Sequence, residues 1–271
     1  MGLRINTNVP ALNAGRTLNR STQALNKSLE RLSSGLRINR ASDDAAGLAV
    51  SEGFRSVVRG TQMAQRNAQD GVSLVQTAEG SLSETTNILQ RIRELAVQAA
   101  NGTQSTDNRT AIDGEVSQLL QQIDNIATDT QFNGIRVLSS SQTVTLQSGA
   151  MTSQTLAITI NGAKTNDLGV SMVHVSTLAT AISAISTIDT ALKSVSTLRS
   201  SLGAYQNRLE FTLNTLAIQE ENSASAESAI RDANIATETI QFTRNQILVS
   251  AGTSVLAQAN VVPQTALQLL R

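Results

Sequence analysis

Residues 245–270 read NQILVSAGTSVLAQANVVPQTALQLL and contain no charged side chain. Apolar residues recur there at helical spacing among Gln, Asn, Ser and Thr: Ile247, Leu248, Val255 and Leu256. This pattern predicts a neutral helix with polar groups around the rest of its circumference. Such a helix is poorly suited to bulk water and too polar for lipid. This helix should therefore be buried against protein, and the place of its burial should decide the fold and the function of the chain.

One neighbouring surface is not enough to hold this helix. Burial of a large aliphatic side chain contributes about 1.5 to 3 kcal/mol, and ten of the 26 residues are Val, Ile or Leu. Ordering each residue costs about 1 to 2 kcal/mol, so docking on one face leaves a deficit. The helix needs neighbours on several sides, either from its own chain or from other copies.

The composition excludes several kinds of site. Aromatic residues are 2% of the chain, there is no Cys, and His174 is the single histidine. Thiolate chemistry, disulfides and multi-histidine metal sites are therefore excluded, and few rings are present to build a compact enzyme pocket. We expect thin, alanine-rich helical seams, with no catalytic residue, no cofactor and no metal.

Charge is balanced overall but unevenly placed. The formal net charge is zero, which gives no electrostatic case for binding nucleic acid or an anionic membrane. Residues 1–40 nevertheless carry seven basic residues and one acid, and residues 210–244 carry six acids and two arginines. Either these are two separate solvated faces, or the two ends of the chain pair in an antiparallel arrangement.

No segment has the pattern of a targeting or membrane-spanning element. The chain has no run of about 20 apolar residues, and its first residues, MGLRIN, lack the apolar stretch of a cleaved signal peptide. We expect no membrane insertion. The protein is expected to be cytoplasmic, or exported by a route that leaves no cleaved signal.

The first predicted helix carries a coiled-coil seam. Its leucines are spaced seven, four, three and four apart: Leu18, Leu25, Leu29, Leu32 and Leu36. Ser33-Ser34-Gly35 is a stop signal, and Ser42-Asp43-Asp44-Ala45 restarts a helix with a capping side chain and acids in the first turn. Because adjacent helical residues point about 100° apart, we interpret the two aspartates as first-turn acids and not as a catalytic pair.

Two further helices are predicted, one from about residue 68 to Asn101-Gly102 and one from Ile112 to Ile126. Three glycines lie within these patterns: Gly71, Gly80 and Gly114. Each lowers helix stability by about 1 kcal/mol relative to Ala. They indicate either close backbone approaches or tolerated surface glycines.

The pattern changes to alternation after Phe132-Asn133-Gly134. Residues 143–147, 156–160 and 170–174 alternate apolar and other residues. This predicts a small, hairpin-like β element at about 132–175, between two helical arms. We interpret His174, at its end, as a structural or surface histidine.

The most regular helical pattern extends from Leu178 to Leu216, with apolar residues stepping by three or four without a break. At 1.5 Å per residue this helix approaches about 60 Å in length. Glu220-Glu221-Asn222 interrupts this apolar pattern, and the acidic segment leads into the neutral tail. The fold is therefore predicted to be mainly α: an elongated antiparallel coiled-coil helical bundle of paired terminal helices and long core helices, with a small β-hairpin region in the middle of the chain.

Long ordered motifs occupy both ends of the chain. They are INTN (5–8), RLSSGLRINRASDDAAGLAVSE (31–52), RNAQDGVSLVQTAEGSL (66–82), LQRIRELAVQAANGT (89–103), LGAYQNRLEFT (202–212) and AQANVVPQTALQLL (257–270). Together they resemble the terminal regions of bacterial flagellins, in a short form that lacks large outer domains.

The resemblance implies an extracellular structural subunit that self-assembles into the flagellar filament, the propeller for swimming, after type III export without a cleaved signal peptide. It implies an inner core of residues 1–42 plus 233–271 and an outer core of 43–232, in which the β element replaces the variable outer domains. A minor flagellin or a hook-filament junction protein is the alternative. An enzyme is not expected.

The resemblance also implies sites and partners. A host Toll-like receptor is expected to recognise Arg91, Leu95 and Glu115. A cytosolic inflammasome receptor is expected to sense the C-terminal leucines. Further partners are other copies in a helical homopolymer, the export chaperone, the filament cap and hook-associated junction proteins. Inner-core polymerisation contacts are expected at Leu18, Leu25, Leu29, Leu32, Ile247, Leu248, Val255, Leu256, Leu267, Leu269 and Leu270.

Overall fold

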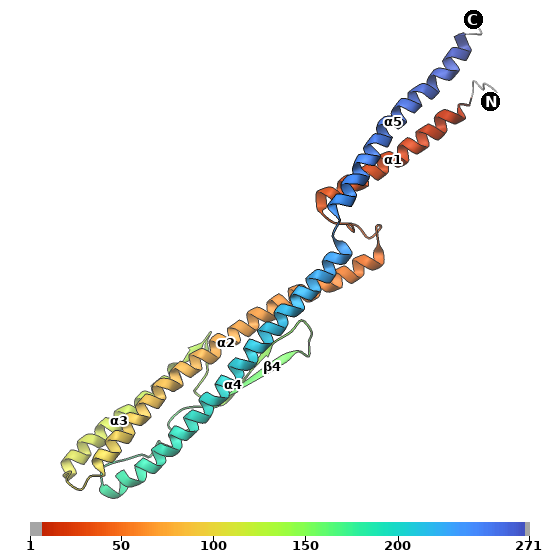
Figure 1. Cartoon of the computed structure of the whole chain (residues 1–271). Coiled ribbons are helices and arrows are strands. Elements are labelled where there is room, and N and C mark those ends of the chain that lie inside the picture. The colour runs from red at the N-terminus through yellow and green to blue at the C-terminus, as the bar shows by residue number, and fades with distance from the viewer. Residues whose placement is uncertain (1–6, 269–271) are drawn as a thin grey trace. The chain divides into compact units, whose positions relative to one another are not determined.

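The structure, a computed structural model, describes residues 7–268, with side chains as far as residue 261. These residues form five helices, which are labelled in Figure 1: α1 (Val9–Ser34), α2 (Ala45–Ala99), α3 (Thr106–Asp129), α4 (Leu178–Arg231) and α5 (Ile235–Gln268). Four strands lie between α3 and α4: β1 (Gln131–Phe132), β2 (Ile135–Arg136), β3 (Gln142–Gln147) and β4 (Thr155–Ile160). The predicted mainly α fold with a small β region is confirmed.

The chain divides into two compact units. Unit 1 comprises residues 1–56 and 222–271, and unit 2 comprises residues 57–221. Unit 1 holds α1 and α5, whereas unit 2 holds α3, the strands and most of α2 and α4. The inner-core and outer-core boundaries expected from the sequence concern the polymer, and they remain a prediction.

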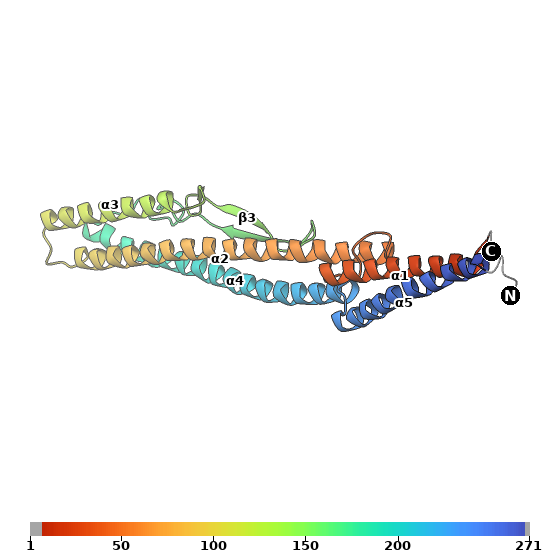
Figure 2. The ribbon, with the colours of Figure 1, turned by 90° about the horizontal axis from the view of Figure 1, so that it is seen from above.

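Unit 2 is built on a seam in which every seventh residue of two long helices is buried. Helix α2 supplies two such rows: Thr61, Ala68, Val75, Leu82, Leu89 and Ala96, and also Ala64, Gly71, Ala78, Thr85, Ile92 and Ala99. Helix α4 supplies a third row: Ala181, Ile188, Val195, Leu202, Leu209 and Leu216. This spacing is that of a coiled coil, and Figure 2 shows α2 and α4 running along one another.

Ion pairs and hydrogen bonds fix the antiparallel direction of α2 and α4 within unit 2. Arg93 Nε lies 2.7 Å from Asp189 Oδ1, and Arg199 Nη2 lies 3.6 Å from Glu79 Oε1. Towards the opposite end of the pair, Gln62 donates a hydrogen bond to Glu220 at 2.7 Å. Residue numbers therefore rise along α2 as they fall along α4, as the predicted bundle requires.

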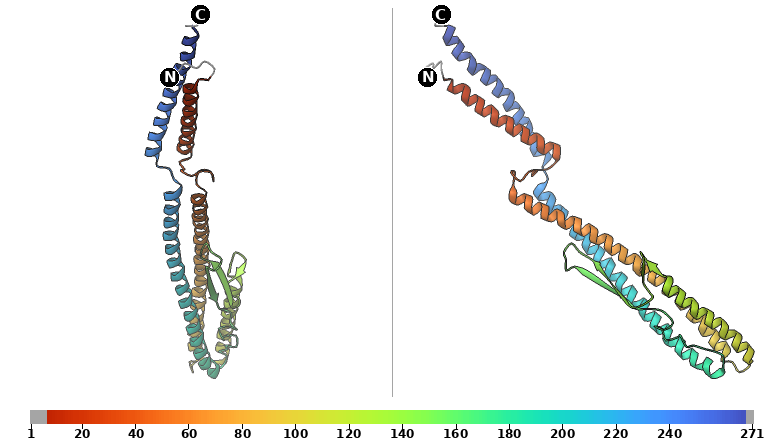
Figure 3. Two further views of the ribbon diagram at one scale, coloured as in Figure 1. Left: turned by 90° about the vertical axis from the view of Figure 1, so that its right-hand side faces the viewer. Right: turned by 180° about the vertical axis from the view of Figure 1, so that it is seen from behind.

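Helix α3 and the segment after β4 cover one side of this seam, as both views in Figure 3 show. Ile112, Val116 and Ile123 of α3 are buried. The Asp124 carboxylate accepts hydrogen bonds from the Thr165 N–H and hydroxyl at 2.9 and 3.0 Å. These bonds tie the segment after β4 to α3.

The predicted hairpin is present as β3 and β4. The strands pair antiparallel, with Leu146 opposite Leu156, and the inward residues of β4 are buried while their neighbours are exposed. A second, smaller hairpin joins β1 to β2 across Asn133 and Gly134. Their positive φ angles, 48° and 79°, suit a tight primed turn. Each of its strands has two residues, too few for alternation to reveal it from sequence.

The third alternating segment, residues 170–174, is not a strand. Gly169 has a φ of 71°, which turns the chain, and Met172 is 88% exposed. The buried side chains that follow are Val170, Val173 and Val175, spaced three and two apart. His174 is exposed, with Nδ1 3.6 Å from Asp113 Oδ2. The segment lies on α3 as an irregular loop, fastened by the Val175 N–H, which donates to Asp113 at 2.6 Å.

The apolar pattern is interrupted at Glu220-Glu221-Asn222, but the helix is not, because α4 continues to Arg231. Glutamate has a high helix propensity, so a polar run ends an apolar pattern without ending the helix. Glu220 also accepts hydrogen bonds from Gln62 at 2.7 Å and Gln65 at 2.9 Å. The polar residues therefore contribute to holding this end of α4 against α2.

The three helical glycines differ in what surrounds them. A Cβ built on Gly71 would lie 2.3 Å from Leu146 Cδ1, whereas a Cβ on Gly80 or Gly114 would meet nothing within 4 Å. We expect Gly80→Ala to raise the free energy of unfolding of unit 2 by roughly 0.5 to 1 kcal/mol, because Gly loses more backbone entropy in a helix. Gly71→Ala should gain less, or lose stability. Equal gains in urea unfolding of the two variants would contradict the close approach at Gly71.

Candidate functional site

Helices α1 and α5 of unit 1 lie side by side in opposite directions, as Figures 1 and 3 show. Three contacts along their length establish the pairing. The Asn8 side chain donates to the Ala259 carbonyl at 2.8 Å, a Cβ built on Gly252 would lie 3.6 Å from Leu18 Cβ, and Arg31 Nη1 lies 3.6 Å from Glu238 Oε2. The neutral tail is therefore paired with the first helix as far as Ala259.

Local sequence signals set the ends of both helices. Asn8 caps α1 by accepting a hydrogen bond from the Ala11 N–H at 3.1 Å, and Gly35 ends it with a φ of 72° and an N–H bond to the Arg31 carbonyl. Asn234 accepts a hydrogen bond from the Thr237 N–H at 3.2 Å in the first turn of α5. The stop signal predicted at residues 33–35 is therefore confirmed.

The helix pair buries very little apolar surface. Within the described side chains of unit 1, residues 7–56 and 222–261, Ile38 is the one fully buried hydrophobic residue, and it belongs to neither helix. The buried residues of α1 are Ser21 and Ser28. Large apolar side chains are exposed instead: Val9, Leu12, Leu29, Ile235, Ile240, Ile247, Leu248, Val255 and Val261.

The predicted inner-core residues divide into two groups. Half-buried between their neighbours are Leu18, Leu25, Leu32 and Leu256. Exposed by 46 to 63% are Leu29, Ile247, Leu248 and Val255. The side chain of Leu267 lies beyond the last described side chain, and Leu269 and Leu270 lie outside the described residues. One helix partner thus covers only part of the apolar surface.

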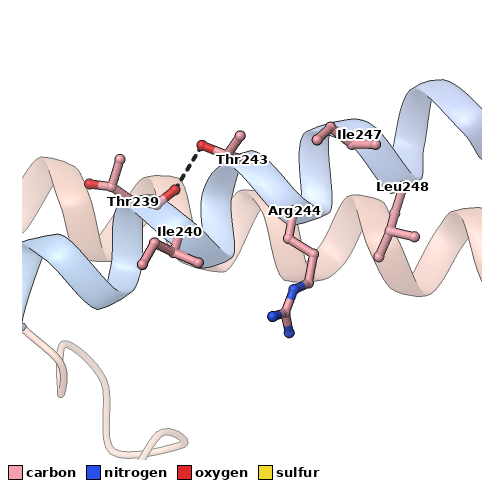
Figure 4. A pocket seen from close by; sticks show the side chains of 6 residues that line it. All are labelled: Thr239, Ile240, Thr243, Arg244, Ile247 and Leu248. Carbon is pink, nitrogen blue, oxygen red and sulfur yellow. Dashed lines mark hydrogen bonds between the residues drawn. The ribbon is translucent and has the colours of Figure 1, made fainter.

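Part of the exposed surface of α5 forms an apolar groove of about 440 Å³. Figure 4 shows Ile240, Arg244 and Leu248, spaced one turn apart, on the same side of the helix. The Thr243 hydroxyl donates to the Thr239 carbonyl at 2.9 Å, so it bonds within its own helix. Arg244 is the one charged residue that lines the groove.

Main-chain bonds fasten the connection after α1 to the connection after α4, and an ion pair joins the end of α4 to α2. Leu36 and Asp232 form a β-bridge, and the Ala233 N–H donates to the Gly35 carbonyl at 2.9 Å. Arg231 Nη1 lies 2.7 Å from Glu52 Oε1, and this guanidinium lowers the pKa of Glu52. The two connections therefore form one tied segment within unit 1.

The Asp43 carboxylate organises the turn before α2. It accepts main-chain N–H bonds from Arg40 and Asn39 at 3.2 and 3.3 Å and lies 2.8 Å from Lys27 Nζ. The Lys27 ammonium, helped by these N–H groups, lowers the pKa of Asp43 to about 2. Asp44 caps α2 by accepting from the Gly47 N–H at 2.8 Å. Both aspartates accept main-chain N–H bonds, but the expectation that they are first-turn acids is wrong, because α2 begins at Ala45 and its first turn contains no acid.

The two ends pair antiparallel, but charge complementarity accounts for only part of this. Arg31 with Glu238 joins the basic N-terminal segment to the acidic C-terminal one. Lys27 and Arg40 instead pair with acids of their own segment, Asp43 and Glu30. Hydrogen bonds and close packing of small residues therefore accompany the charges in the pairing.

Two of the predicted receptor-epitope residues meet on the surface of unit 2. Arg91 Nη2 on α2 lies 3.0 Å from Glu115 Oε1 on α3, and Glu94 lies 3.2 Å from Nη1. Glu115, with a smaller contribution from Glu94, raises the pKa of Arg91 above its ordinary value. Leu95 is 2% exposed and belongs to the core. The structure thus separates an exposed ion pair from a buried leucine.

The described residues, 7–268, form neither a metal site nor a membrane-spanning helix. No cluster of three or more His, Asp or Glu side chains close enough to hold a metal ion is found there. None of the helices in that range is both long and apolar enough to cross a membrane.

The family is decided by the two ends of the chain. Residues 5–143 match the model of the bacterial flagellin N-terminal helical region, and residues 185–270 match that of the C-terminal helical region. This chain belongs to the bacterial flagellin family. Flagellins are structural proteins that self-assemble into the extracellular filament of the bacterial flagellum, and this chain is a filament subunit.

Relatives of this flagellin match it over nearly its whole length. A flagellin of Halalkalibacterium halodurans is 47% identical, covering 98% of this chain and 99% of the relative. The flagellar filament 33 kDa core protein of Treponema phagedenis is 46% identical with the same coverage. The solved structure of a putative flagellar hook-associated protein from Vibrio parahaemolyticus, 11% identical, covers 70% of this chain and 100% of that chain with a TM-score of 0.59. At that identity it shows a shared fold alone.

Sequence reasoning missed one buried group in this flagellin's helix pair. Glu238 is 7% exposed, and in α5 it is the one buried residue among the described side chains. In the sequence it is one of six acids in residues 210–244, and no pattern there points to a specific partner. The sequence does carry a signal for this contact: an acid lies in the first turn of α5 and Arg31 lies in the last turn of α1. Antiparallel pairing of the two helices brings those turns together.

The lowered pKa of Asp43 predicts a pH dependence for filaments of this flagellin. A carboxylate with a folded-state pKa of about 2 and an ordinary value of 3.8 contributes stability above about pH 4. That contribution is lost as the pH falls through about 2. We therefore expect Asp43→Asn to dissociate filaments more readily than wild type at pH 6, with the difference shrinking between pH 4 and 2. Pelleting of filaments measures this.

The control for this experiment is Asp70→Asn, which removes the same charge at an exposed position of α2. It should not show this trend with pH. A constant difference between Asp43→Asn and wild type from pH 6 to pH 2 would contradict the role of the Asp43 carboxylate.

Proposed function

We propose that α1 and α5 form the inner core of the filament, and that their exposed apolar surface is covered by other copies of the chain. The observation that supports this is the burial pattern of the pair. Helix α5 is uncharged from Asn245 onward, yet Ile247 is 63% and Val255 is 58% exposed. Burial of such side chains between copies supplies the stabilisation that one helix partner does not.

In this proposal the inner core comprises residues 1–42 and 233–271, and the outer core comprises residues 43–232, with the β element at about 132–175 in place of larger outer domains. Unit 2 supports the outer-core assignment because its own seam is buried without a second copy: Leu82, Leu89 and Ile188 are each 0% exposed. The polymer then has one part that is folded by itself and one part completed by assembly.

Filament growth in this proposal follows export of the unfolded chain through the type III channel, without a cleaved signal peptide. The export chaperone, the filament cap and the hook-associated junction proteins are the proposed partners on that route. Nucleic acid, membrane insertion and enzymatic turnover play no part. The names of the relatives, flagellin and flagellar filament core protein, favour the body of the filament over a minor flagellin or a junction protein.

We also propose that host receptors recognise this chain. The Toll-like receptor epitope would comprise Arg91, Leu95 and Glu115. The exposed ion pair between Arg91 and Glu115 supports surface recognition, while Leu95, one turn from Arg91 and buried, would act by holding α2 in position. The cytosolic receptor would sense Leu267, Leu269 and Leu270.

Seeded polymerisation tests the proposed function. Purified chain is mixed with short sheared filaments of the same protein and viewed by negative-stain electron microscopy. We expect long tubes of uniform width that extend from the seeds. Seeds without added chain should keep their length. Chain that stays soluble or forms irregular aggregates in the presence of seeds would refute the proposal.

A further inference from the structure

Glu238 is a buried carboxylate in a helix pair that otherwise buries small and polar residues. Its side chain is 9% exposed, and Arg31 Nη1 lies 3.6 Å from its Oε2 atom. The Arg31 side chain is 24% exposed, and its Nε atom is buried without a hydrogen-bond partner. Both members of the pair are thus largely removed from water, unlike the exposed pair of Arg40 and Glu30.

The positions of the two residues suit only one alignment of the helices. Glu238 lies in the first turn of α5, where the helix dipole favours an anion, and Arg31 lies in the last turn of α1, where it favours a cation. The antiparallel pairing brings these turns together. If α5 slid by one turn towards Gly35, Glu238 would lose its cation and remain beside a helix end that repels it. A shift in the opposite direction would bring it towards Lys27, which already pairs with Asp43 at 2.8 Å.

The rest of the interface holds one packing contact that depends on the alignment. Gly252 packs on Leu18, and a shift of one turn would bring Leu256 or Leu248 against Leu18 in its place. The buried residues of α1, Ser21 and Ser28, are small and specify no partner by their size. The ion pair adds a second, electrostatic discrimination at the other end of the helix pair, because removing one partner leaves an uncompensated buried charge.

We propose that Arg31 and Glu238 are positioning residues for assembly, and that their ion pair fixes how far α5 is shifted along α1. The inference rests on the proposed function, because it concerns the surface that other copies cover. The exposed residues of α1 and α5 belong to one recognition surface only when the two helices keep a constant offset. Every copy in a helical polymer must present the same surface, so one offset has to be selected.

Engineered disulfides report this offset directly, because the chain has no Cys of its own. A Cβ built on Gly252 would lie 3.6 Å from Leu18 Cβ, close to the usual Cβ separation in a disulfide of about 3.8 Å. Leu18→Cys with Gly252→Cys therefore reports the observed alignment. Leu18→Cys with Leu256→Cys reports a shift of one turn. The ratio of the two intrachain cross-links is measured by non-reducing electrophoresis, in filaments and in soluble chain.

Both reporters are combined with Arg31→Glu, with Glu238→Arg and with the two changes together. We expect each single reversal to lower the ratio of native to shifted cross-link at least fivefold and to reduce filament yield. The double reversal should restore at least half of the wild-type ratio, although it opposes both helix dipoles. Arg20→Glu, an exposed residue of α1 with the same charge change, should leave the ratio unchanged.

Two results would overturn the proposal that the ion pair fixes the offset of α5 along α1. The first is a double reversal whose cross-link ratio is no higher than that of either single change. The second is a set of single changes that leave the cross-link ratio at its wild-type value. Failure of the proposed function looks different. In that case the chain without any of these substitutions forms no filaments, while the cross-link ratio of the reporter chains in solution still reports the alignment.

Discussion

Replacing Ile247 with Asp is expected to raise the critical concentration for filament assembly by about a thousandfold. The side chain is 63% exposed in the single chain, so its burial between copies contributes about 2 kcal/mol. Burying a carboxylate in its place costs about 2 kcal/mol more. A total of about 4 kcal/mol corresponds to about three orders of magnitude in an association constant. Sedimentation of filaments over a concentration series measures the change.

The neighbouring change Gln246→Asp serves as the matched control. It introduces the same charge one residue away, at an exposed polar position of α5, and removes no large apolar side chain. We expect its critical concentration to rise much less. If the two variants behaved alike, charge in this region and not apolar burial at Ile247 would govern assembly.

The second large effect concerns the core of unit 2. Leu89→Ala should lower the free energy of unfolding by about 2 to 5 kcal/mol, because it removes a 0% exposed leucine from the seam of α2 and leaves a cavity. Urea unfolding of the soluble chain, followed by circular dichroism, measures the loss. Val97→Ala, on the same helix and 49% exposed before truncation, should change stability by less than about 0.5 kcal/mol. A loss below about 1 kcal/mol at Leu89 would contradict the seam.

The elements with strong local signals could be predicted from the sequence. Gly35 ends α1 in a left-handed conformation, and the alternation around Leu156 is that of β4. The coiled-coil seam of α4 follows from steps of three and four. Each of these depends on neighbours in the chain, so sequence alone carries the information.

What could not be predicted depends on contacts between distant residues. Gly71 and Gly80 look alike in sequence, but only Gly71 faces a side chain of β3. The apolar alternation at residues 170–174 is typical of a strand. Which of these residues are buried depends instead on their contacts with α3 and the seam. Burial of Glu238 likewise depends on α1, more than 200 residues earlier in the chain.

The sevenfold spacing of buried residues in α2 and α4 limits how these helices can change in length. A straight α-helix drifts by about 20° per heptad relative to such a repeat, so the two helices are expected to wind around one another with a left-handed supercoil. Inserting one residue into α2 would turn every later side chain by about 100° and expose Leu82, Leu89 and Ile92 together. Length changes within these helices should therefore be tolerated in steps of seven, and other insertions should be confined to the loops and hairpins.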